Sequence, residues 1–384
     1  MKTPRIAAEK IQQLAATFKA VAIIGPRQSG KTTLSKLYFP EKPYVSLENP
    51  AMRQFAIDDP QGFLAQYPQG AILDEIQRVP ELLSWLQQIL DESDTKGKFV
   101  LTGSNNLLLL EKITQTLAGR VAYIELLPFS LSETLATHPS GKPIDVLLWE
   151  GAYPSVQAQS IPPMDWFAAY VRTYVERDVR QIRNIENLLL FERFLSLCAG
   201  RIGQQVNYAN LANETGIDQK TAQAWLGVLQ ASYILFLLPP WFQNFNKRVT
   251  KSPKLYFYDT GLAAYLLGIR QPDMLPLHPY RGALFENFII LELLKNRFNR
   301  GERPNLYYWK DSTCEIDVLI APGNTAFPVE IKSGQTITAD YFKCLSYWNR
   351  LSGQTGGLVL YGGDESQERS NGLTVKSWRA VVDI

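Results

Sequence analysis

The sequence has few of the residues that build disulfide frameworks or zinc sites. Its three cysteines, Cys198, Cys314 and Cys344, are widely spaced, and its two histidines, His138 and His278, stand alone. This scarcity excludes a disulfide scaffold and a Cys/His zinc site, and it favours a reducing compartment. No apolar run approaches the ~18 residues of a membrane span, and the N-terminus lacks the apolar core of a signal peptide. We therefore expect a soluble, cytoplasmic protein.

Net charge is also small. The 39 Lys and Arg residues nearly balance the 37 Asp and Glu residues, which leaves a formal charge of +2. The total therefore predicts no polyanionic partner, and any basic surface must be local. Hydrophobic residues make up 46% of the 384 residues and charged residues 20%, which is typical of folded globular proteins. At roughly 100–200 residues per domain, the length predicts two or three domains.

The first third alternates short apolar runs with helical periodicity, which predicts an α/β domain with a parallel sheet and crossover helices. Leucines at helical spacing predict a helix over Glu81–Glu92, and another follows the first strand over Lys31–Tyr38. A turn-rich stretch over 139–163 indicates a domain boundary near it. The expected strands are Ala20–Ile24, Tyr44–Leu47, Ala71–Asp74, Phe99–Thr102 and Val121–Glu125.

The middle of the chain is mostly helical in pattern. Asn207–Ser232 has the spacing of a helix-turn-helix with its turn at Gly216. Two apolar strands follow, Tyr233–Leu238 and Lys254–Tyr258, so the segment reads as a winged helix-turn-helix. The final third predicts, in order, a helix, three strands, a helix and a strand: Ala283–Phe298, Leu306–Trp309, Glu315–Ile320, Phe327–Lys332, Ala339–Leu351 and Leu358–Tyr361. We expect four parts: residues 1–138, a helical linker or lid at 139–190, a winged helix-turn-helix at 191–268, and an α/β domain at 269–384.

One segment after the first expected strand carries a specific phosphate-binding pattern. Residues 25–32 match G-x-x-x-x-G-K-[ST] between an apolar strand and a helix, which is the context that the motif requires. Backbone N–H groups at the helix start would face the phosphates of ATP, Lys31 would neutralise them, and the Thr32 hydroxyl would reach Mg²⁺. The expected binding residues are Gly25, Pro26, Arg27, Gln28, Ser29, Gly30, Lys31, Thr32 and Thr33.

Polar residues at two later strand ends fit the same chemistry. Asp74 ends an apolar strand and would hold Mg²⁺, and Glu75 beside it could polarise the attacking water. Ser104, or less readily Asn105, follows the next strand and could sense the γ-phosphate, although both residue types also serve as plain helix caps. The alternative for Asp74 and Glu75 is an ordinary solvated strand end.

Arg120 lies just before the fifth expected strand. If the strands have the usual order, it lies beyond reach of its own phosphate loop. It could extend to the γ-phosphate of a neighbouring subunit as an arginine finger. The alternative is a surface arginine that pairs with a carboxylate. The first reading requires a homo-oligomer, which could be a ring.

In this order the parts resemble an AAA+ ATPase. Gly-Pro-Arg-Gln-Ser-Gly-Lys-Thr-Thr, Leu-Asp-Glu-Ile-Gln, Leu-Thr-Gly-Ser, Leu-Ala-Gly-Arg and Tyr-Val-Glu-Arg-Asp-Val resemble one prokaryotic family of such ATPases, over nearly the whole chain. That family carries a C-terminal domain with a restriction-nuclease-like core. The resemblance implies ATP binding and hydrolysis with Mg²⁺ but names no substrate.

Carboxylates recur near the C-terminus on neighbouring strands. Glu330 and Lys332 face the same side of one strand, and a hairpin can bring Asp317 beside them. Two carboxylates and a lysine suit Mg²⁺-assisted phosphodiester hydrolysis, and Glu286 on the preceding helix could complete the cluster. The element order resembles the PD-(D/E)XK nuclease core. Three readings stay open: an active nuclease, an inactive nuclease-like fold that binds nucleic acid or protein, and charges on an ordinary hairpin.

Basic residues concentrate around the expected winged helix. Between Gln219 and Tyr258 there is no acidic residue, which favours contact with the phosphate backbone of DNA. A solvated loop, or docking on an acidic subunit, would explain the same pattern. The five basic residues are Lys220, Lys247, Arg248, Lys251 and Lys254.

The sequence thus predicts a cytoplasmic ATPase that acts on DNA and couples ATP hydrolysis to movement of its C-terminal half. Two alternatives remain. One is a nucleotide-switched protein-interaction module with an inactive nuclease-like domain, and the other is an ATP-gated, Mg²⁺-dependent nuclease.

Overall fold

A computed structural model describes residues 3–104, 113, 115–159, 161–175, 187–241, 252–323 and 325–384. The chain forms two compact units, each considered by itself. The first unit comprises residues 1–129, 231–233 and 297–302. The second comprises residues 130–230, 234–296 and 303–384. The four-part division expected from the sequence stays a prediction.

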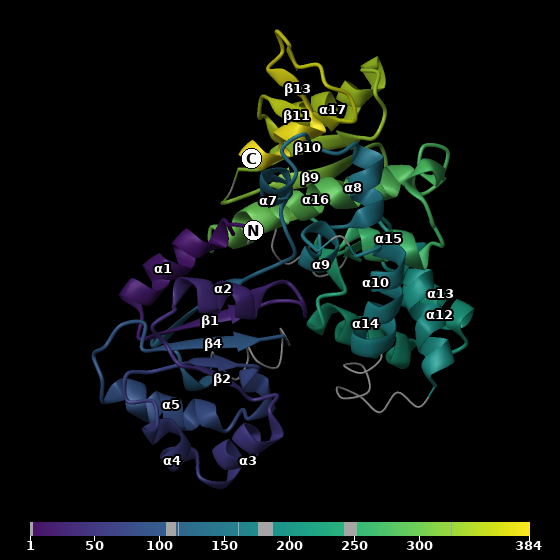
Figure 1. Cartoon of the computed structure of the whole chain (residues 1–384). Helices are drawn as coiled ribbons and strands as arrows, with labels where there is room; N and C mark the ends of the chain where they lie inside the picture. The colour runs from purple at the N-terminus through teal and green to yellow at the C-terminus, as the bar shows by residue number, and fades with distance from the viewer. Residues whose placement is uncertain are drawn as a thin grey trace. The chain divides into compact units, whose positions relative to one another are not determined.

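The first unit is built on a five-stranded parallel sheet with the order β2-β3-β4-β1-β5, as the alternating pattern predicted (Figure 1). β1 lies between β4 and β5, and Ile24 at its end is level with Gly103 and Glu125. The carboxyl ends of the strands therefore share one edge of the sheet, where ligands bind in open α/β folds. Its elements are α1 (Ala7–Thr17), β1 (Ala20–Ile24), α2 (Lys31–Tyr38), β2 (Tyr44–Ser46), α3 (Pro50–Asp58), α4 (Pro60–Ala65), β3 (Ile72–Asp74), η1 (Ile76–Arg78), α5 (Leu82–Asp91), β4 (Phe99–Gly103) and β5 (Val121–Glu125).

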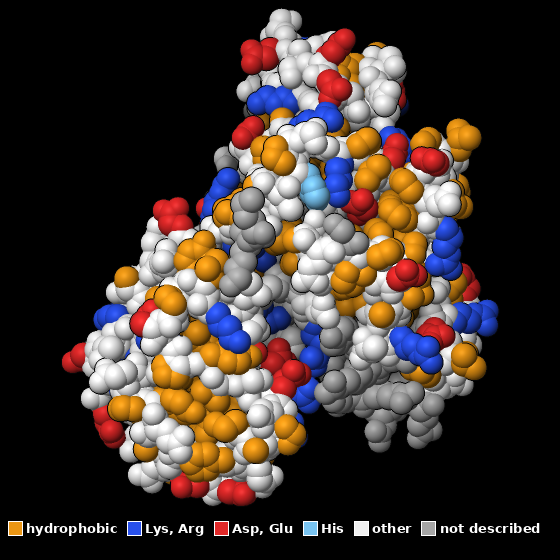
Figure 2. All heavy atoms as spheres, viewed as in Figure 1, with side chains coloured by type: hydrophobic (Ala, Val, Ile, Leu, Met, Phe, Trp, Pro, Cys, Tyr) orange, Lys and Arg blue, Asp and Glu red, His pale blue; other side chains and the backbone are white. Residues whose placement is uncertain are grey.

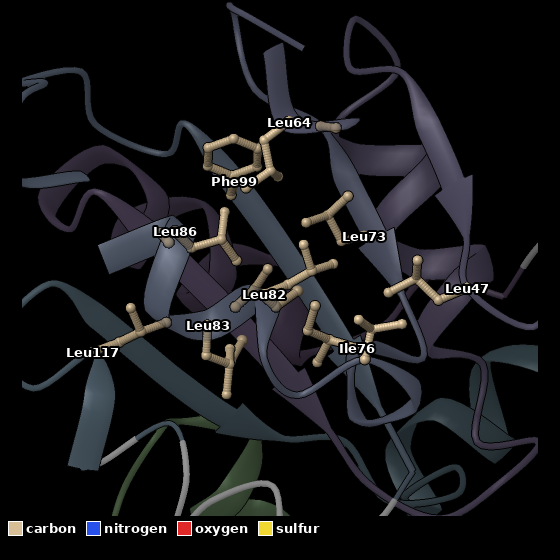
Figure 3. Close-up of a cluster of buried hydrophobic side chains, with 14 of the residues drawn as sticks. Leu47, Leu64, Leu73, Ile76, Leu82, Leu83, Leu86, Phe99 and Leu117 are labelled. Carbon is tan, nitrogen blue, oxygen red and sulfur yellow. The ribbon is translucent and has the colours of Figure 1, made fainter. Parts of the chain in front are cut away.

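Both faces of this sheet are covered, because β1 is apolar at every position and alternates between two cores. Ala20, Ala22 and Ile24 belong to a cluster with residues of α4 and α5, part of which Figure 3 shows around Leu73, Leu82 and Phe99. Val21 and Ile23 belong to a second cluster with residues of α1 and α2. The sheet is thereby fixed between two layers of helices, and its polar strand ends are held in register.

The second unit begins with helices. α8 packs against α15 and α10 against α15, and Asp259 at the start of α15 accepts a hydrogen bond from the Ala152 backbone N–H at 2.7 Å. The helices of this part are α7 (Leu131–Thr137), α8 (Ile144–Glu150), α9 (Pro154–Gln157), α10 (Pro163–Tyr170) with a π-helical turn η2 (Val171–Val175), α12 (Leu188–Ala199), α13 (Tyr208–Thr215), α14 (Gln219–Ala231), α15 (Thr260–Leu266) and η4 (Pro272–Met274).

α13 and α14 form the helix pair that the sequence predicted, and Gly216 between them is left-handed with φ +87°. Asn207 caps α13, and its side chain accepts a hydrogen bond from the Asn210 backbone N–H. An antiparallel pair follows, β6 (Leu235–Leu238) and β7 (Lys254–Phe257), with Leu238 opposite Lys254. The assignment of this segment as a winged helix stays a prediction.

A six-stranded mixed sheet with the order β12-β13-β11-β10-β9-β8 completes the second unit. β9 and β10 are antiparallel, whereas β10 and β11 are parallel and joined through α17. The expected helix over Ala339–Leu351 divides into a 3₁₀ turn and α17, and β12, β13 and η6 were not expected. The elements are α16 (Arg281–Asn299), β8 (Leu306–Lys310), β9 (Glu315–Ile320), β10 (Phe327–Lys332), η5 (Ala339–Phe342), α17 (Lys343–Ser352), β11 (Gly357–Tyr361), β12 (Gln367–Glu368), β13 (Leu373–Ser377) and η6 (Trp378–Asp383).

The surface of the first unit is mixed in character. Figure 2 shows hydrophobic side chains gathered over the part of this unit that holds α3, α4 and α5, where Ile57 is 52% and Trp85 38% exposed. Within the described ranges, no helix has the length and apolar character needed to span a bilayer.

Candidate nucleotide-binding site

The segment that joins β1 to α2 has the backbone shape of a phosphate loop. Gly25 has φ +152°, Gln28 φ +62° and Gly30 φ +94°, so the chain repeatedly enters the region that favours glycine. A Cβ on Gly25 would lie 2.2 Å from the Leu126 carbonyl oxygen, so no larger residue fits there without movement. Gly30 caps α2 without a side chain, which leaves the first N–H groups of the helix available to an anion.

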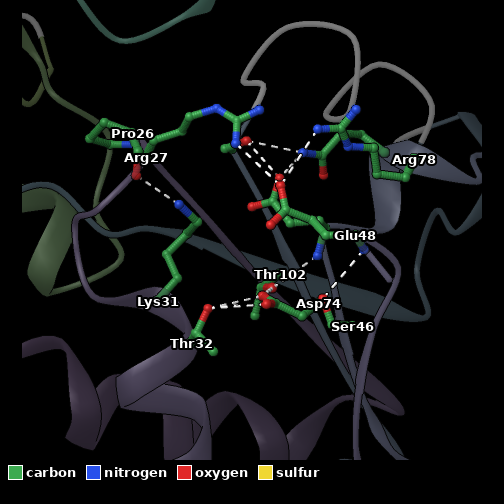
Figure 4. Close-up of polar contacts among 12 residues, drawn as sticks. Pro26, Arg27, Lys31, Thr32, Ser46, Glu48, Asp74, Arg78 and Thr102 are labelled. Atoms are coloured by element: carbon green, nitrogen blue, oxygen red, sulfur yellow. Dashed lines mark hydrogen bonds and ion pairs between the residues drawn. The ribbon is translucent and has the colours of Figure 1, made fainter. Parts of the chain in front are cut away.

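Two side chains of this loop fit a bound phosphate. Lys31 is only 5% exposed, and its Nζ donates to the carbonyl oxygens of Gly25 at 3.0 Å and Pro26 at 2.7 Å (Figure 4). Ser29 is fully buried, and its hydroxyl has no hydrogen-bond partner among the described residues. A buried donor without a partner is costly, and a phosphate oxygen would satisfy it. Thr33 lies exposed on the first turn of α2.

Asp74 lies at the end of β3 and accepts hydrogen bonds from hydroxyl groups of three other elements. The Thr32 hydroxyl lies 3.1 Å from Oδ1, and the Tyr44 hydroxyl donates to Oδ2 at 2.6 Å. Thr102 on β4 also donates its hydroxyl to Asp74 (Figure 4). Burial and the Asp74 carboxylate raise the pKa of Tyr44, so its hydroxyl holds the donated proton more tightly than an exposed tyrosine would. Thr32 and Asp74 therefore lie together, where both could hold a magnesium ion that accompanies ATP.

Glu75 follows Asp74 with φ +59°, a left-handed conformation that is uncommon for glutamate. Its Oε2 accepts hydrogen bonds from Gln77 Nε2 at 2.6 Å and from the Ser104 hydroxyl at 3.0 Å. Ser104, expected as a phosphate sensor, thus lies against the carboxylate expected to activate water. Glu75 is only 9% exposed, and the two hydrogen bonds fix its carboxylate at the sheet edge.

Several residues that brace the loop were not found from the sequence. Arg5 is 8% exposed and donates to the carbonyl oxygens of Ser29 at 2.6 Å and Leu127 at 2.7 Å. Glu48 lies 3.5 Å from guanidinium nitrogens of both Arg27 and Arg78 (Figure 4).

These bracing residues, like Tyr44 and Thr102, lie far in sequence from the groups they contact. The sheet accounts for one of these contacts, since β2 and β3 are parallel neighbours and Tyr44 lies opposite Ile72, two residues before Asp74.

Arg120 lies apart from these residues and contacts α5. Its guanidinium makes a two-point ion pair with Asp91, with Nη2–Oδ2 at 2.9 Å and Nε–Oδ1 at 2.5 Å. Hydrogen bonding to Arg120 lowers the pKa of Asp91. The structure therefore shows the arginine–carboxylate pair that was the alternative to an arginine finger.

The predicted metal-binding carboxylates of the second unit converge, but each meets a protein partner. Glu286 on α16 pairs with Lys254 at 3.3 Å. Asp317 on β9 accepts a hydrogen bond from the Ile331 backbone N–H at 2.7 Å. On β10, Lys332 Nζ lies 2.5 Å from Glu330 and 3.7 Å from Asp317. In the parts of the chain that the structure describes, no group of three or more His, Cys, Asp or Glu side chains is arranged to hold a metal ion.

Burial dominates the electrostatics of this cluster. It raises the pKa of Glu286 to about 7 and that of Glu330 to about 8, and the negative charge of Asp317 adds to both shifts. Burial opposes the charge of Lys254, yet Glu286, Asp317 and Glu315 raise its pKa above the ordinary value. The cluster therefore holds its lysines charged, and its Glu286 and Glu330 carboxyl groups bind protons more readily than exposed carboxyl groups do.

The expected DNA contacts need one correction. Lys254 is 3% exposed and faces the acidic cluster, so it cannot reach a nucleic-acid phosphate, and its assignment as a DNA contact is wrong for this structure. Lys220 is exposed on the first turn of α14, as a DNA contact requires. Lys247, Arg248 and Lys251 lie outside the described residues.

Comparison with known proteins agrees with the division into an ATPase-like first part and a distinct remainder. Residues 17–135 match a family described as an AAA domain. Residues 142–273 and 281–381 match two domains of unknown function, DUF8612 and DUF4143.

The chain is 32% identical over 339 residues to the uncharacterized proteins Rv2008c of Mycobacterium tuberculosis and Mb2031c of Mycobacterium bovis, which covers 86% of this chain and 74% of each relative. Among solved structures, the Walker-type ATPase of Pyrococcus abyssi aligns with a TM-score of 0.44 at 14% identity, over 68% of this chain and 94% of that one.

Proposed function

The chain belongs to the same family as these two mycobacterial proteins, and we propose that it hydrolyses ATP in its first part. That part is an AAA-type, P-loop ATPase-like domain, which supports ATP binding. The observation that carries the proposal is one sheet edge at which the phosphate loop, Asp74 and Glu75 meet. Lys31 and Ser29 bind phosphate oxygens, and Thr32 and Asp74 hold Mg²⁺. Glu75 accepts a proton from the attacking water.

Two substitutions separate binding from turnover. Lys31→Ala should weaken ATP binding at least tenfold, because a charge-assisted contact is lost. Glu75→Gln should bind ATP as the wild type does and lose turnover, since the amide cannot take the proton. Binding is measured by calorimetry and turnover by phosphate release. Lys96→Ala and Glu81→Gln, at exposed positions of the same unit, are the matched controls. Normal turnover by Glu75→Gln would remove Glu75 from its role.

We further propose that the protein acts on DNA and that ATP hydrolysis moves its C-terminal half. The exposed Lys220 at the start of the second helix of a helix-turn-helix supports this, because the N-terminal turn of that helix is the part that contacts DNA in such motifs. The test is the ATPase rate with duplex, single-stranded and branched DNA over a salt series. Stimulation by one form of DNA should weaken steeply as salt is raised. The DNA concentration that gives half-maximal stimulation reports the apparent binding constant, and Lys220→Ala should reduce the slope of its logarithm against log[salt] by about one.

A different outcome would favour the second candidate. If no DNA form changes the ATPase rate, a nucleotide-switched interaction module is the better reading. An oligomer in which Arg120 reaches a neighbouring nucleotide requires the Arg120–Asp91 pair to open, so Asp91→Asn should then increase the ATPase rate. An ATP-gated nuclease requires Mg²⁺-dependent cutting that Asp317→Ala and Lys332→Ala both abolish.

A further inference from the structure

Lys254 is a buried charge with an unusual position. It begins β7, and its Nζ forms ion pairs with Glu286 of α16 at 3.3 Å and with Glu315 of β9. The ring of Tyr308 on β8 lies 5.6 Å from the same ammonium. With only 3% of the residue exposed, the ammonium is enclosed by groups from three other elements.

A second residue of β7 supports this arrangement. Tyr256 is two positions after Lys254, so both side chains lie on the same face of the strand. The Tyr256 hydroxyl donates to Glu286 Oε1 at 2.5 Å, the same oxygen that Lys254 contacts. Glu286 is thus held by two groups of one strand.

The remaining carboxylates are also engaged. Asp317 Oδ2 accepts the Ile331 N–H and lies near Lys332, and Glu330 Oε1 pairs with Lys332. One oxygen, Glu330 Oε2, is buried without a hydrogen-bond partner among the described residues. Magnesium needs about six oxygen ligands in octahedral geometry around a shared point. The residues do not fit that ion as they stand, because an ammonium lies between Glu286 and Glu315.

We infer that Lys254 is the resident cation of this cluster and takes the place that a divalent metal would need. The positive charge of the ammonium compensates the carboxylates and repels Mg²⁺, and the ion pairs fasten β7 to α16 and β9. The cluster is therefore a clamp made of protein charges alone. Once the ammonium is removed, Glu286, Glu315 and the free oxygen of Glu330 become available to a metal ion.

Manganese binding tests this inference without any measurement of activity. Free Mn²⁺ is followed by electron paramagnetic resonance while it is titrated into the full-length, nucleotide-free protein. The wild type and Asp317→Asn should bind equal amounts. Lys254→Met should gain one site at least tenfold tighter than any in the wild type, and Lys254→Met with Glu286→Gln should lose it. The nucleotide site is the same in all variants, so its contribution cancels.

A neighbouring lysine supplies the control. Lys310 pairs with Glu315 at 2.7 Å, but its side chain is 48% exposed. Lys310→Met should change Mn²⁺ affinity less than twofold, because this ammonium lies outside the enclosed position. A folded Lys254→Met that gains no site would overturn the inference. So would a wild-type site that disappears in Asp317→Asn, and this second comparison holds even if Lys254→Met fails to fold.

Discussion

At the scale of single residues, the carboxyl group of Glu125 makes the stability of the first unit depend on pH. Glu125 ends β5 and is partly buried, and the Tyr233 hydroxyl donates to its Oε2 at 2.9 Å. Burial raises the pKa of Glu125 to about 7, although the hydrogen bond from Tyr233 opposes the shift. The folded protein therefore holds this proton more tightly than the unfolded chain does. The stabilisation that protonated Glu125 gives the folded state is fully present below its pKa in the unfolded chain, about 4.5. It is lost as the pH rises through its folded-state pKa of about 7.

Replacement of Glu125 should remove this pH dependence. Glu125→Gln mimics the protonated acid and should stabilise the protein by roughly 2–3 kcal/mol at pH 8, with little difference near pH 4.5. Urea unfolding from pH 4.5 to pH 8 measures the difference. Glu41→Gln, at an exposed position before β2, should give parallel curves for variant and wild type. An equal gain at all pH values would mean that Glu125 ionisation is not the cause.

At the scale of elements, the strand-to-helix connection is shaped by its glycines. Gly25 has a backbone conformation that side chains rarely adopt, and it lies against the chain that follows β5. α2 can begin at Lys31 only because the loop turns this tightly. The same tight turn brings Thr32 to the end of β3, so binding geometry and fold share one constraint.

Two glycine substitutions distinguish this constraint from a general effect. Gly25→Ala should destabilise the protein by at least roughly 1–3 kcal/mol, because both its φ angle and the Leu126 carbonyl oppose a Cβ. Gly227→Ala, inside α14 with open space around it, should stabilise by about 0.5–1 kcal/mol. Chemical denaturation measures both changes. Equal effects at the two sites would contradict the role given to Gly25.

At the scale of the whole molecule, two units with separate cores carry different kinds of chemistry. The nucleotide site belongs entirely to the first unit, and the acidic cluster with Lys254 belongs entirely to the second. A rigid-body movement of the second unit during an ATP cycle would leave its internal hydrogen bonds intact. Nucleotide should therefore stabilise the strands of one unit selectively.

Hydrogen exchange with a non-hydrolysable ATP analogue tests this selectivity. At 100 times the dissociation constant, binding stabilises the first unit by about 2.7 kcal/mol, so amides of β1, β3 and β4 should exchange about 100-fold more slowly. Amides of β9, β10 and β11 should be unchanged. The Lys31→Ala variant should show neither effect. Equal slowing in both units would show that they unfold as one.

The sequence by itself determined the phosphate loop and the polar residues that end the successive strands. Such features are contiguous, and their geometry follows from glycine, from the start of a helix and from alternating apolar strands. Tertiary structure alone decided which groups face Asp74 and which group braces the phosphate loop, because Tyr44, Thr102 and Arg5 arrive from distant segments. It also decided the surroundings of Lys254. The sequence shows that a positive charge is present, but only packing determines whether that charge meets solvent or, as here, a carboxylate.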